Sequence, residues 1–201
     1  MKRLLPLIIA AALPLLTFAQ TAAAPKADTS NAPKSETAKP QAPAQDLSLR
    51  VPPAKPEDVN SLDSILKAIY DVISGPAGDR DWNRFRSLFI PEARLTSAQK
   101  SKDGSIFLTD VDGYSRRAGG YFKTHGFYES GIVNRVEKFG NIAQVFSSYA
   151  SRNAPGEKPF ARGINSIQLF NDGKRWWVVS ILWDEESQSN PLPPELANPG
   201  N

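Results

Sequence analysis

RGINSIQLFNDGKRWWVVSILWDEE, residues 162–186, is the stretch that decides the fold of this chain. Two runs rich in β-branched and aromatic residues, 163–170 and 175–183, flank Asn171-Asp172-Gly173, a tripeptide typical of a tight hairpin turn. The second run carries three of the four tryptophans and has apolar side chains on both faces. A strand of this kind is covered on both faces. The sequence therefore predicts an antiparallel hairpin whose second strand lies inside a sheet.

The rest of the domain divides into helical and strand-like segments. Apolar residues recur at helical spacing in about 60–73, 81–90 and 110–125, each behind a Ser, Asn or Asp that can cap a helix. Gly126 suits the left-handed residue that closes the third helix. Residues 93–108 predict a short strand or two around a turn at 102–104, and 132–139 and 142–151 alternate with a period of two. We expect an α+β domain over residues 59–186.

The segments outside this domain have different compositions. Residues 1–19 resemble an export signal, with Lys2 and Arg3, an apolar centre at 4–16 and a small-residue end at Ala19. The apolar run is about 13 residues, short of the roughly 20 that span a membrane. We therefore expect cleavage, a periplasmic or secreted protein, and no membrane association afterwards. Residues 20–58 are rich in Ala, Pro and Lys and predict a disordered linker, and 187–201 predict a flexible tail.

Composition excludes several classes of function. The chain has no cysteine, which excludes disulfides and thiolate-bound metals, and its one histidine excludes a multi-histidine zinc site within the chain. The formal net charge is +3, but the basic residues are interspersed with acidic ones and form no basic stripe. We expect no nucleic acid partner, no metal and no cofactor.

Short motifs along the domain resemble a known superfamily. They are GDRDW at 78–82, SLF at 87–89, EARL at 92–95, FGNIAQV at 139–145, SSY at 147–149 and RWW at 175–177. The order of elements and these motifs are similar to the nuclear transport factor 2-like superfamily, which includes ketosteroid isomerase, scytalone dehydratase and SnoaL-like proteins. The resemblance implies a cone-shaped α+β fold, with three N-terminal helices packed on a strongly curved, mainly antiparallel sheet. It also implies one apolar pocket between the helices and the sheet.

The resemblance does not bring a complete mechanism. The carboxylate base of the isomerase falls at Ser97, whose hydroxyl cannot serve as that base. Its oxyanion tyrosine corresponds to Tyr70. Scytalone dehydratase depends on two histidines, and this chain has only His125.

Six residues are candidates for a ligand site: Tyr70, Tyr121, His125, Arg162, Asn165 and Trp183. Helical spacing could bring His125 near Tyr121 and near Glu129, giving a proton-transfer pair with a carboxylate to orient it. The alternative is a structural histidine that binds free carbonyls at the end of its helix. Asn165 either orients a ligand or bonds a neighbouring strand.

Three functions remain open at this stage. The first is an exported domain that binds a small apolar or amphipathic molecule, or a partner, without catalysis. The second is a cofactor-independent isomerase or dehydratase with His125 as base and Tyr70 or Tyr121 as donor. The third is a structural module that forms a homodimer through the outer face of the sheet, because helices cover only one face.

Overall fold

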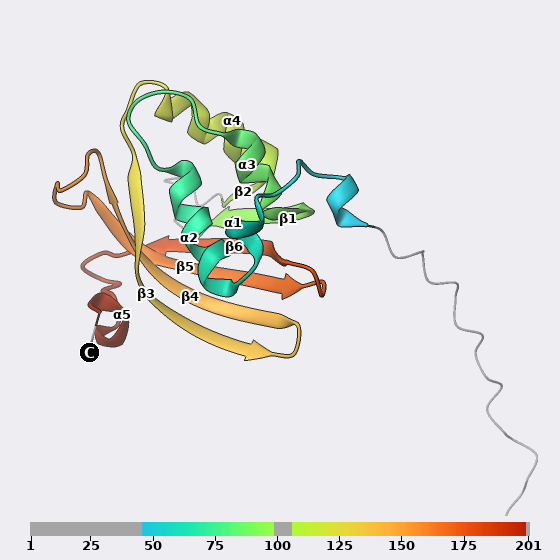
Figure 1. The fold of residues 1–201 in the computed structure, drawn as a ribbon. Helices are drawn as coiled ribbons and strands as arrows, with labels where there is room; N and C mark the ends of the chain where they lie inside the picture. The colour runs from blue at the N-terminus through green and yellow to red at the C-terminus, as the bar shows by residue number, and fades with distance from the viewer. Residues whose placement is uncertain (1–45, 99–105, 200–201) are drawn as a thin grey trace, which may run out of the picture. The chain divides into compact units, whose positions relative to one another are not determined.

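Six strands form one mixed sheet in the order β2-β1-β6-β5-β4-β3 (Figure 1). The computed structural model describes residues 46–98 and 106–199, so the expected signal peptide and the turn at 102–104 lie outside the described residues. The strands are β1 Phe89–Ser97, β2 Phe107–Asp110, β3 Tyr128–Phe139, β4 Ile142–Arg152, β5 Ala161–Asn171 and β6 Trp176–Glu185. The helices are η1 Leu47–Leu49, α1 Pro56–Val59, α2 Leu62–Ile73, α3 Trp82–Ser87, α4 Val111–Phe122 and α5 Pro194–Ala197.

The predicted hairpin is confirmed as β5 and β6, and β6 is an interior strand. Gly173 takes a positive φ of 92° in the turn, and the indole Nε1 of Trp177 donates to Asp172 Oδ2 at 2.8 Å. The guanidinium carbon of Arg175 lies 3.7 Å from the centre of a Trp177 ring. On its other edge, β6 pairs with β1 in parallel, whereas every other pairing of these six strands is antiparallel.

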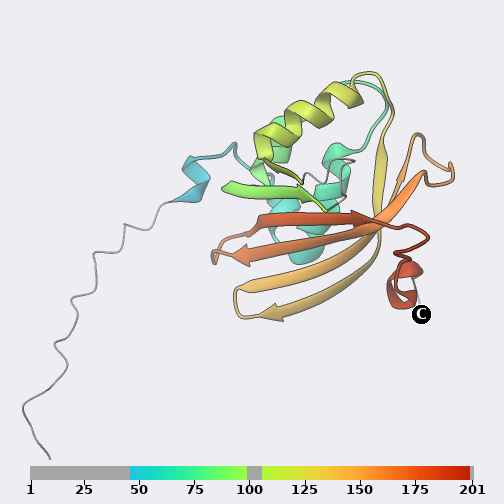
Figure 2. The same cartoon turned by 180° about the vertical axis from the view of Figure 1, so that it is seen from behind.

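Bulges let the long strands curve around α2. The β3–β4 register shifts between Gly131 and Val133, with the extra residue in β3, and the β5–β6 register shifts between Gln168 and Leu169, with the extra residue, Val179, in β6. Such bulges bend a strand and increase its twist. Figures 1 and 2 show β3 and β4 bending beneath α2, which packs on β3 and β6, while α3 and α4 pack on β1. The described domain is thus a curved sheet with helices over its concave face.

The core lies between α2 and the middle of the sheet. Ser61 caps α2 by accepting from the backbone N–H of Ser64. From α2, the core cluster contains Ile65, Leu66, Ala68, Ile69, Val72 and Ile73. From the sheet, it contains Phe89, Ala93, Leu95, Ala143, Val145, Ile167, Leu169, Trp176, Val178 and Ile181. Full burial of each large apolar side chain is worth about 1.5–3 kcal/mol. This packing holds the concave face at a fixed distance from α2.

Two predicted helices are shorter than the sequence analysis expects. The second ends at Ser87, and Phe89 opens β1, because the Leu88 carbonyl accepts from Val178 N at 3.0 Å and pairing with β6 begins there. The third ends at Phe122. Gly126 is not in the left-handed region. A Cβ there would lie 2.4 Å from the Asn153 carbonyl oxygen, so this glycine permits a close backbone approach instead.

Ordered structure also extends beyond the predicted domain limits. Within 46–58, assigned above to the linker, η1 and α1 form, and Asp58 is buried beside Arg84 with two hydrogen bonds of 2.8 Å. The predicted tail contains α5, whose Leu196 is buried. Arg162 donates to the Ala197 carbonyl at 2.8 Å. A few well-placed apolar and charged residues therefore fix segments that composition alone assigns to disorder.

Candidate functional site

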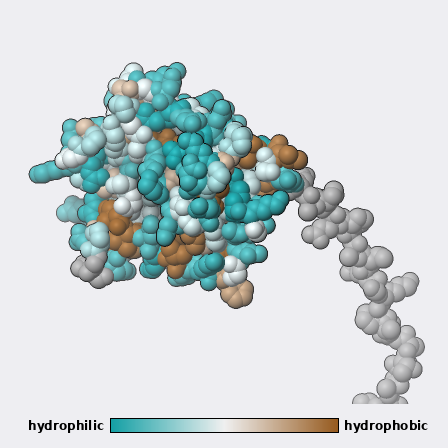
Figure 3. Space-filling view, in the orientation of Figure 1, coloured by the Kyte–Doolittle hydropathy of each residue, from teal (hydrophilic) through white to brown (hydrophobic). Residues whose placement is uncertain are grey.

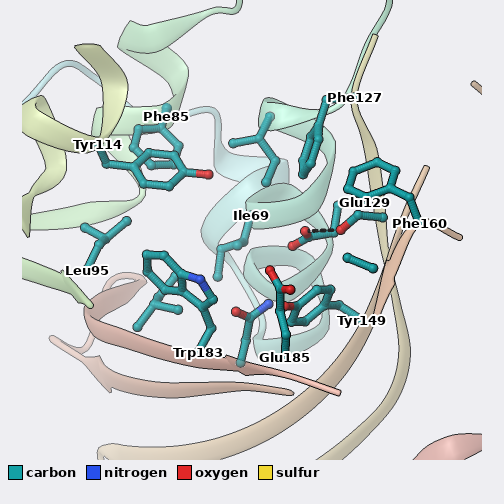
Figure 4. A pocket seen from close by; sticks show the side chains of 15 residues that line it. Ile69, Phe85, Leu95, Tyr114, Phe127, Glu129, Tyr149, Phe160, Trp183 and Glu185 are labelled. Atoms are coloured by element: carbon teal, nitrogen blue, oxygen red, sulfur yellow. Dashed lines mark hydrogen bonds between the residues drawn. The ribbon is translucent and has the colours of Figure 1, made fainter. Parts of the chain in front are cut away.

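A cavity of about 180 Å³ lies between α2, α4 and the concave face of the sheet (Figure 4). Fifteen residues line it: Ile69, Ile73, Phe85, Leu95, Tyr114, Phe127, Glu129, Tyr149, Ser151, Phe160, Ala161, Asn165, Ile181, Trp183 and Glu185. They come from three helices and from strands β1, β3, β4, β5 and β6, and from the segments beside β3 and β5. The site therefore exists only in the folded domain.

The polar side of the cavity is built by rows of residues that run across the sheet. Tyr149, Gly163 and Glu185 are paired across β4, β5 and β6. In the next inward row, Ser147, Asn165 and Trp183 are paired across the same strands. Residues two apart on a strand share a face, so both rows point to the concave side.

Gly163 makes room for the phenol ring of Tyr149. A Cβ at Gly163 would lie 2.7 Å from the Tyr149 hydroxyl oxygen and 2.2 Å from the Asp184 carbonyl oxygen. The ring therefore occupies space that a side chain at this position would fill. Because Glu185 follows in the same row, the phenol and this carboxylate lie on the same side of the cavity (Figure 4).

The other side of the cavity is aromatic and aliphatic. Tyr114 stacks on Phe85 with ring centres 5.3 Å apart, and Trp183 meets Tyr114 edge-on at 6.3 Å. Two further rings lie on the same side as Glu129: Phe127 and Phe160 are 6.2 Å apart at their ring centres, with the exposed Phe160 at the rim. Figure 4 shows Leu95 and Tyr114 opposite Glu129 and Phe160. The cavity thus has an apolar wall facing a polar one.

Glu129 is the most perturbed acid of the polar wall. It pairs with Ser151 across β3 and β4, and the Ser151 hydroxyl donates to Glu129 Oε2 at 2.7 Å. The pKa of Glu129 is raised from 4.5 to about 7: burial raises it most, the Ser151 hydroxyl and the Asn165 amide lower it, and the nearby Glu185 also raises it. Glu129 therefore changes its charge near neutral pH.

A buried hydrogen-bond network stands behind the polar wall. The hydroxyls of Tyr70 and Ser147 share a hydrogen bond of 2.5 Å, and Asn165 Nδ2 donates to the Tyr70 oxygen at 3.2 Å. Burial raises the pKa of Tyr70 to about 12, so this phenol stays neutral. Its contact with Asn165 orients the amide at the cavity surface.

The structure separates the six residues named by the sequence into two groups. Asn165 and Trp183 line the cavity, and Tyr70 lies one hydrogen bond behind Asn165. Arg162 does not line it. Its guanidinium lies 3.4 Å from a Glu186 carboxylate oxygen and donates to the Ala197 carbonyl.

His125 and Tyr121 also lie outside the cavity. Both are exposed, their rings stack with centres 4.2 Å apart, and His125 Nδ1 lies 3.1 Å from the Tyr121 carbonyl oxygen. The structure therefore does not bring His125 and Tyr70 together in one pocket, as the proton-transfer hypothesis requires. The physical reason is that α4 ends at Phe122, so helical spacing does not continue to Glu129, which lies in β3.

Sequence reasoning missed Glu185, Tyr149 and Tyr114 and gave Glu129 only a supporting role. One signal was present: Glu185 lies two residues after Trp183, on the face that the alternation assigns to the inside. The position of Tyr149 depends on Gly163 in the next strand, which no local pattern reveals.

Two features are absent from the described residues. Residues 46–98 and 106–199 contain no group of three or more histidine, cysteine or acidic residues that could hold a metal ion. No helix in the same part of the chain is long and apolar enough to cross a membrane.

Comparison with known proteins finds similarity at the level of structure only. No protein-family model matches the chain, and no curated protein matches its sequence. A protein of unknown function from Mycobacterium tuberculosis is 12% identical, with a TM-score of 0.50 and coverage of 69% of this chain and 78% of its own.

Two further structures are described as NTF2-like proteins of unknown function. The one from Silicibacter pomeroyi is 13% identical, covers 63% of this chain and 94% of its own, and has a TM-score of 0.46. The one from Shewanella baltica is 16% identical, with 64% and 98% coverage and a TM-score of 0.43. The described domain is an α+β fold with helices over the concave face of a six-stranded curved sheet, and the Mycobacterium tuberculosis protein is similar to it at the level of the fold.

Proposed function

We propose that the domain binds a small amphipathic molecule in the cavity over the concave face of the sheet. The observation that carries this proposal is the cavity itself, about 180 Å³ with an aromatic wall facing a polar one. An engineered apolar cavity of about 150 Å³ binds benzene. The cavity therefore suits one ring with a short polar substituent, and is smaller than the roughly 300–1,000 Å³ of sites for drug-sized ligands.

The two walls of the cavity contact different parts of the proposed ligand. The rings of Phe85, Tyr114 and Trp183 offer apolar area to a ring or branched group. At the opposite end, Asn165 and Glu129 offer a few fixed polar groups, as is usual in small-molecule sites. The hydrogen bond from Asn165 to Tyr70 holds the amide in place before a ligand arrives, which lowers the entropic cost of binding.

Native mass spectrometry of the protein purified from its own host tests this proposal. We expect a bound small molecule that leaves on denaturation. The variant Ala161→Phe places a ring in the cavity and should lose that molecule, whereas Ala77→Phe, at an exposed loop position, should keep it. A ligand-free mass for the wild type, together with no rise in melting temperature in phenol or phenethyl alcohol, would contradict the proposal.

A second function, cofactor-independent proton transfer, is favoured by Glu129 rather than by His125. An acid whose pKa lies at about 7 is suited to accept and return a proton at neutral pH. The test is exchange of the acidic C–H protons of phenylacetone in heavy water, followed by NMR. Wild-type protein should speed the exchange and Glu129→Gln should not, while equal rates for the two would exclude this function.

Export and dimerisation through the sheet stay predictions. Figure 3 shows a mostly hydrophilic face with separate apolar patches. Val136, Phe139 and Ile142, at the β3–β4 turn, are exposed apolar residues, and Leu182 is exposed on β6. Light scattering during size-exclusion chromatography would measure the mass, and a monomer at every concentration would count against a dimer.

A further inference from the structure

We propose that the ligand is an organic cation, a protonated amine carried by a single aromatic or branched apolar group, with its ammonium group held between Glu129 and Glu185. This inference rests on the proposed function, because it names the chemical class of the ligand for the same cavity. It follows from the charge balance of the cavity, from a buried hydroxyl that faces it, and from the nature of its walls.

The charge of the cavity wall is negative and uncompensated. Glu129 and Glu185 both line the cavity, and none of its fifteen described lining residues is Lys, Arg or His. Arg162 precedes Gly163, the strand partner of Glu185. Its guanidinium, however, forms an ion pair with Glu186 and donates a hydrogen bond to the Ala197 carbonyl. An ammonium group supplies the missing positive charge, and carboxylates accept its hydrogen bonds strongly.

The charged neighbours of the cavity groups are also acidic. Around Glu129, the charge that acts on it is that of Glu185, besides the hydroxyl of Ser151 and the amide of Asn165. Burial raises the pKa of the Tyr149 phenol most, and the carboxylates of Glu129, Glu185 and Asp184 raise it further. The pKa of Tyr114 is likewise raised, first by burial and then by Glu129. Each of these groups therefore lies in a negative field that favours a cation.

The Tyr149 hydroxyl gives a second, independent indication. The residue is only 4% exposed, and the described part of the chain offers its hydroxyl no hydrogen bond. Among the same residues, no buried side-chain oxygen is sealed off without a partner, so this oxygen faces the cavity. Because buried polar groups in proteins are almost always hydrogen-bonded, we infer that a ligand N–H donates a hydrogen bond to the Tyr149 hydroxyl oxygen.

The geometry places these acceptors around one end of the cavity. Figure 4 shows the carboxyl groups of Glu129 and Glu185 turned toward each other, with Tyr149 beside Glu185. The carboxylate of Glu185 has no hydrogen bond or ion pair with another side chain of residues 46–98 and 106–199. A primary ammonium has N–H donors for both carboxylates and for the phenol oxygen.

The apolar wall and the cavity volume indicate the size and apolar character of the rest of the ligand. The faces of aromatic rings attract cations as well as apolar groups, and Phe127 and Phe160 lie on the same side of the cavity as Glu129 (Figure 4). A volume of about 180 Å³ accommodates one ring and a short chain. Phenethylamine has this size and charge and is the probe of choice.

Calorimetric titration at about pH 8 compares phenethylamine with its neutral analogue phenethyl alcohol and the anion phenylacetate. Hydrogen bonds to charged groups predict that the amine binds about tenfold to hundredfold more tightly than the alcohol. Phenylacetate should bind most weakly. The preference for the amine should shrink in Glu129→Gln and in Glu185→Gln and disappear in the double variant. Glu137→Gln, at an exposed position of β3, the strand of Glu129, should keep the preference for the amine.

The pH dependence gives a second measurement. Because Glu129 loses its proton at about pH 7, affinity for the amine should rise between about pH 6 and pH 8 and affinity for the alcohol should not. An alcohol that binds as tightly as the amine would overturn this inference and leave the proposed function intact. Binding of none of the three probes would also overturn it, and a natural ligand seen by native mass spectrometry would then still support the proposed function.

Discussion

Replacing Glu129 by glutamine removes an acid that the folded chain keeps protonated to a higher pH than the unfolded chain does. In the folded state the pKa is raised from 4.5 to about 7, chiefly by burial and then by Glu185. Between these two values the folded protein binds a proton that the unfolded chain has released. The free energy of unfolding of the wild type therefore falls as the pH rises through this window.

The size of the effect follows from the displacement of the pKa. At about 1.4 kcal/mol per pKa unit, the shift from 4.5 to about 7 corresponds to about 3 kcal/mol. Because Glu129 is only partly buried, we expect about 2–3 kcal/mol. Below about pH 4.5 the contribution vanishes, and above about pH 7 it is constant. Glutamine cannot ionise, so the variant should lack this loss.

Urea unfolding of ligand-free protein at a series of pH values measures the difference. Relative to the wild type, Glu129→Gln should gain about 2–3 kcal/mol between about pH 4.5 and pH 8. Any pH-independent effect of the glutamine amide on the free energy of unfolding cancels, because only the change of this free energy with pH is compared. Glu137→Gln, at an exposed position of β3, should follow the wild type. Parallel curves for Glu129→Gln and the wild type would refute the reasoning and place the carboxyl in water.

Three further changes test other contacts by the same unfolding measurement. Gly163→Ala should lower the free energy of unfolding by about 2–3 kcal/mol, because its Cβ would lie 2.2 Å from a carbonyl oxygen. Gly120→Ala, open to solvent in α4, should raise it by about 0.5–1 kcal/mol. Equal effects of the two variants would contradict the clash at Gly163. Leu196→Ala should cost about 2–3 kcal/mol, since this side chain is buried, and no loss would mean that α5 does not dock. Asp58→Asn should cost about 2–3 kcal/mol by leaving Arg84 partly buried without its carboxylate, and an unchanged midpoint would show the pair to be solvated.

The strongest local patterns were reliable guides to the fold. The alternation and turn of residues 162–186 predicted β5 and β6, and Asp81 and Asp110 cap α3 and α4 as expected, by accepting from backbone N–H groups. These features depend on a few neighbouring residues, which act in the same way in any fold. Helix ends were less reliable, because the end of α3 depends on pairing of β1 with β6.

The site was predicted only in part, for a physical reason. Asn165 and Trp183 were found because they interrupt or extend an alternating apolar face. Helical spacing correctly placed His125 beside Tyr121, but both are exposed, and the spacing does not extend to Glu129 because α4 ends at Phe122. A local spacing rule holds only within the element to which it applies.

The sequence by itself determined the order of the elements, the central hairpin and the absence of thiol or multi-histidine chemistry, since these depend on residue type and short-range spacing. Only the tertiary structure decided that Glu129, Tyr149 and Glu185 share one cavity, because the curvature of the sheet and the missing side chain at Gly163 bring together side chains from three strands, β3, β4 and β6. The raised pKa of Glu129 has the same origin, because burial and a second carboxylate are properties of that assembled space.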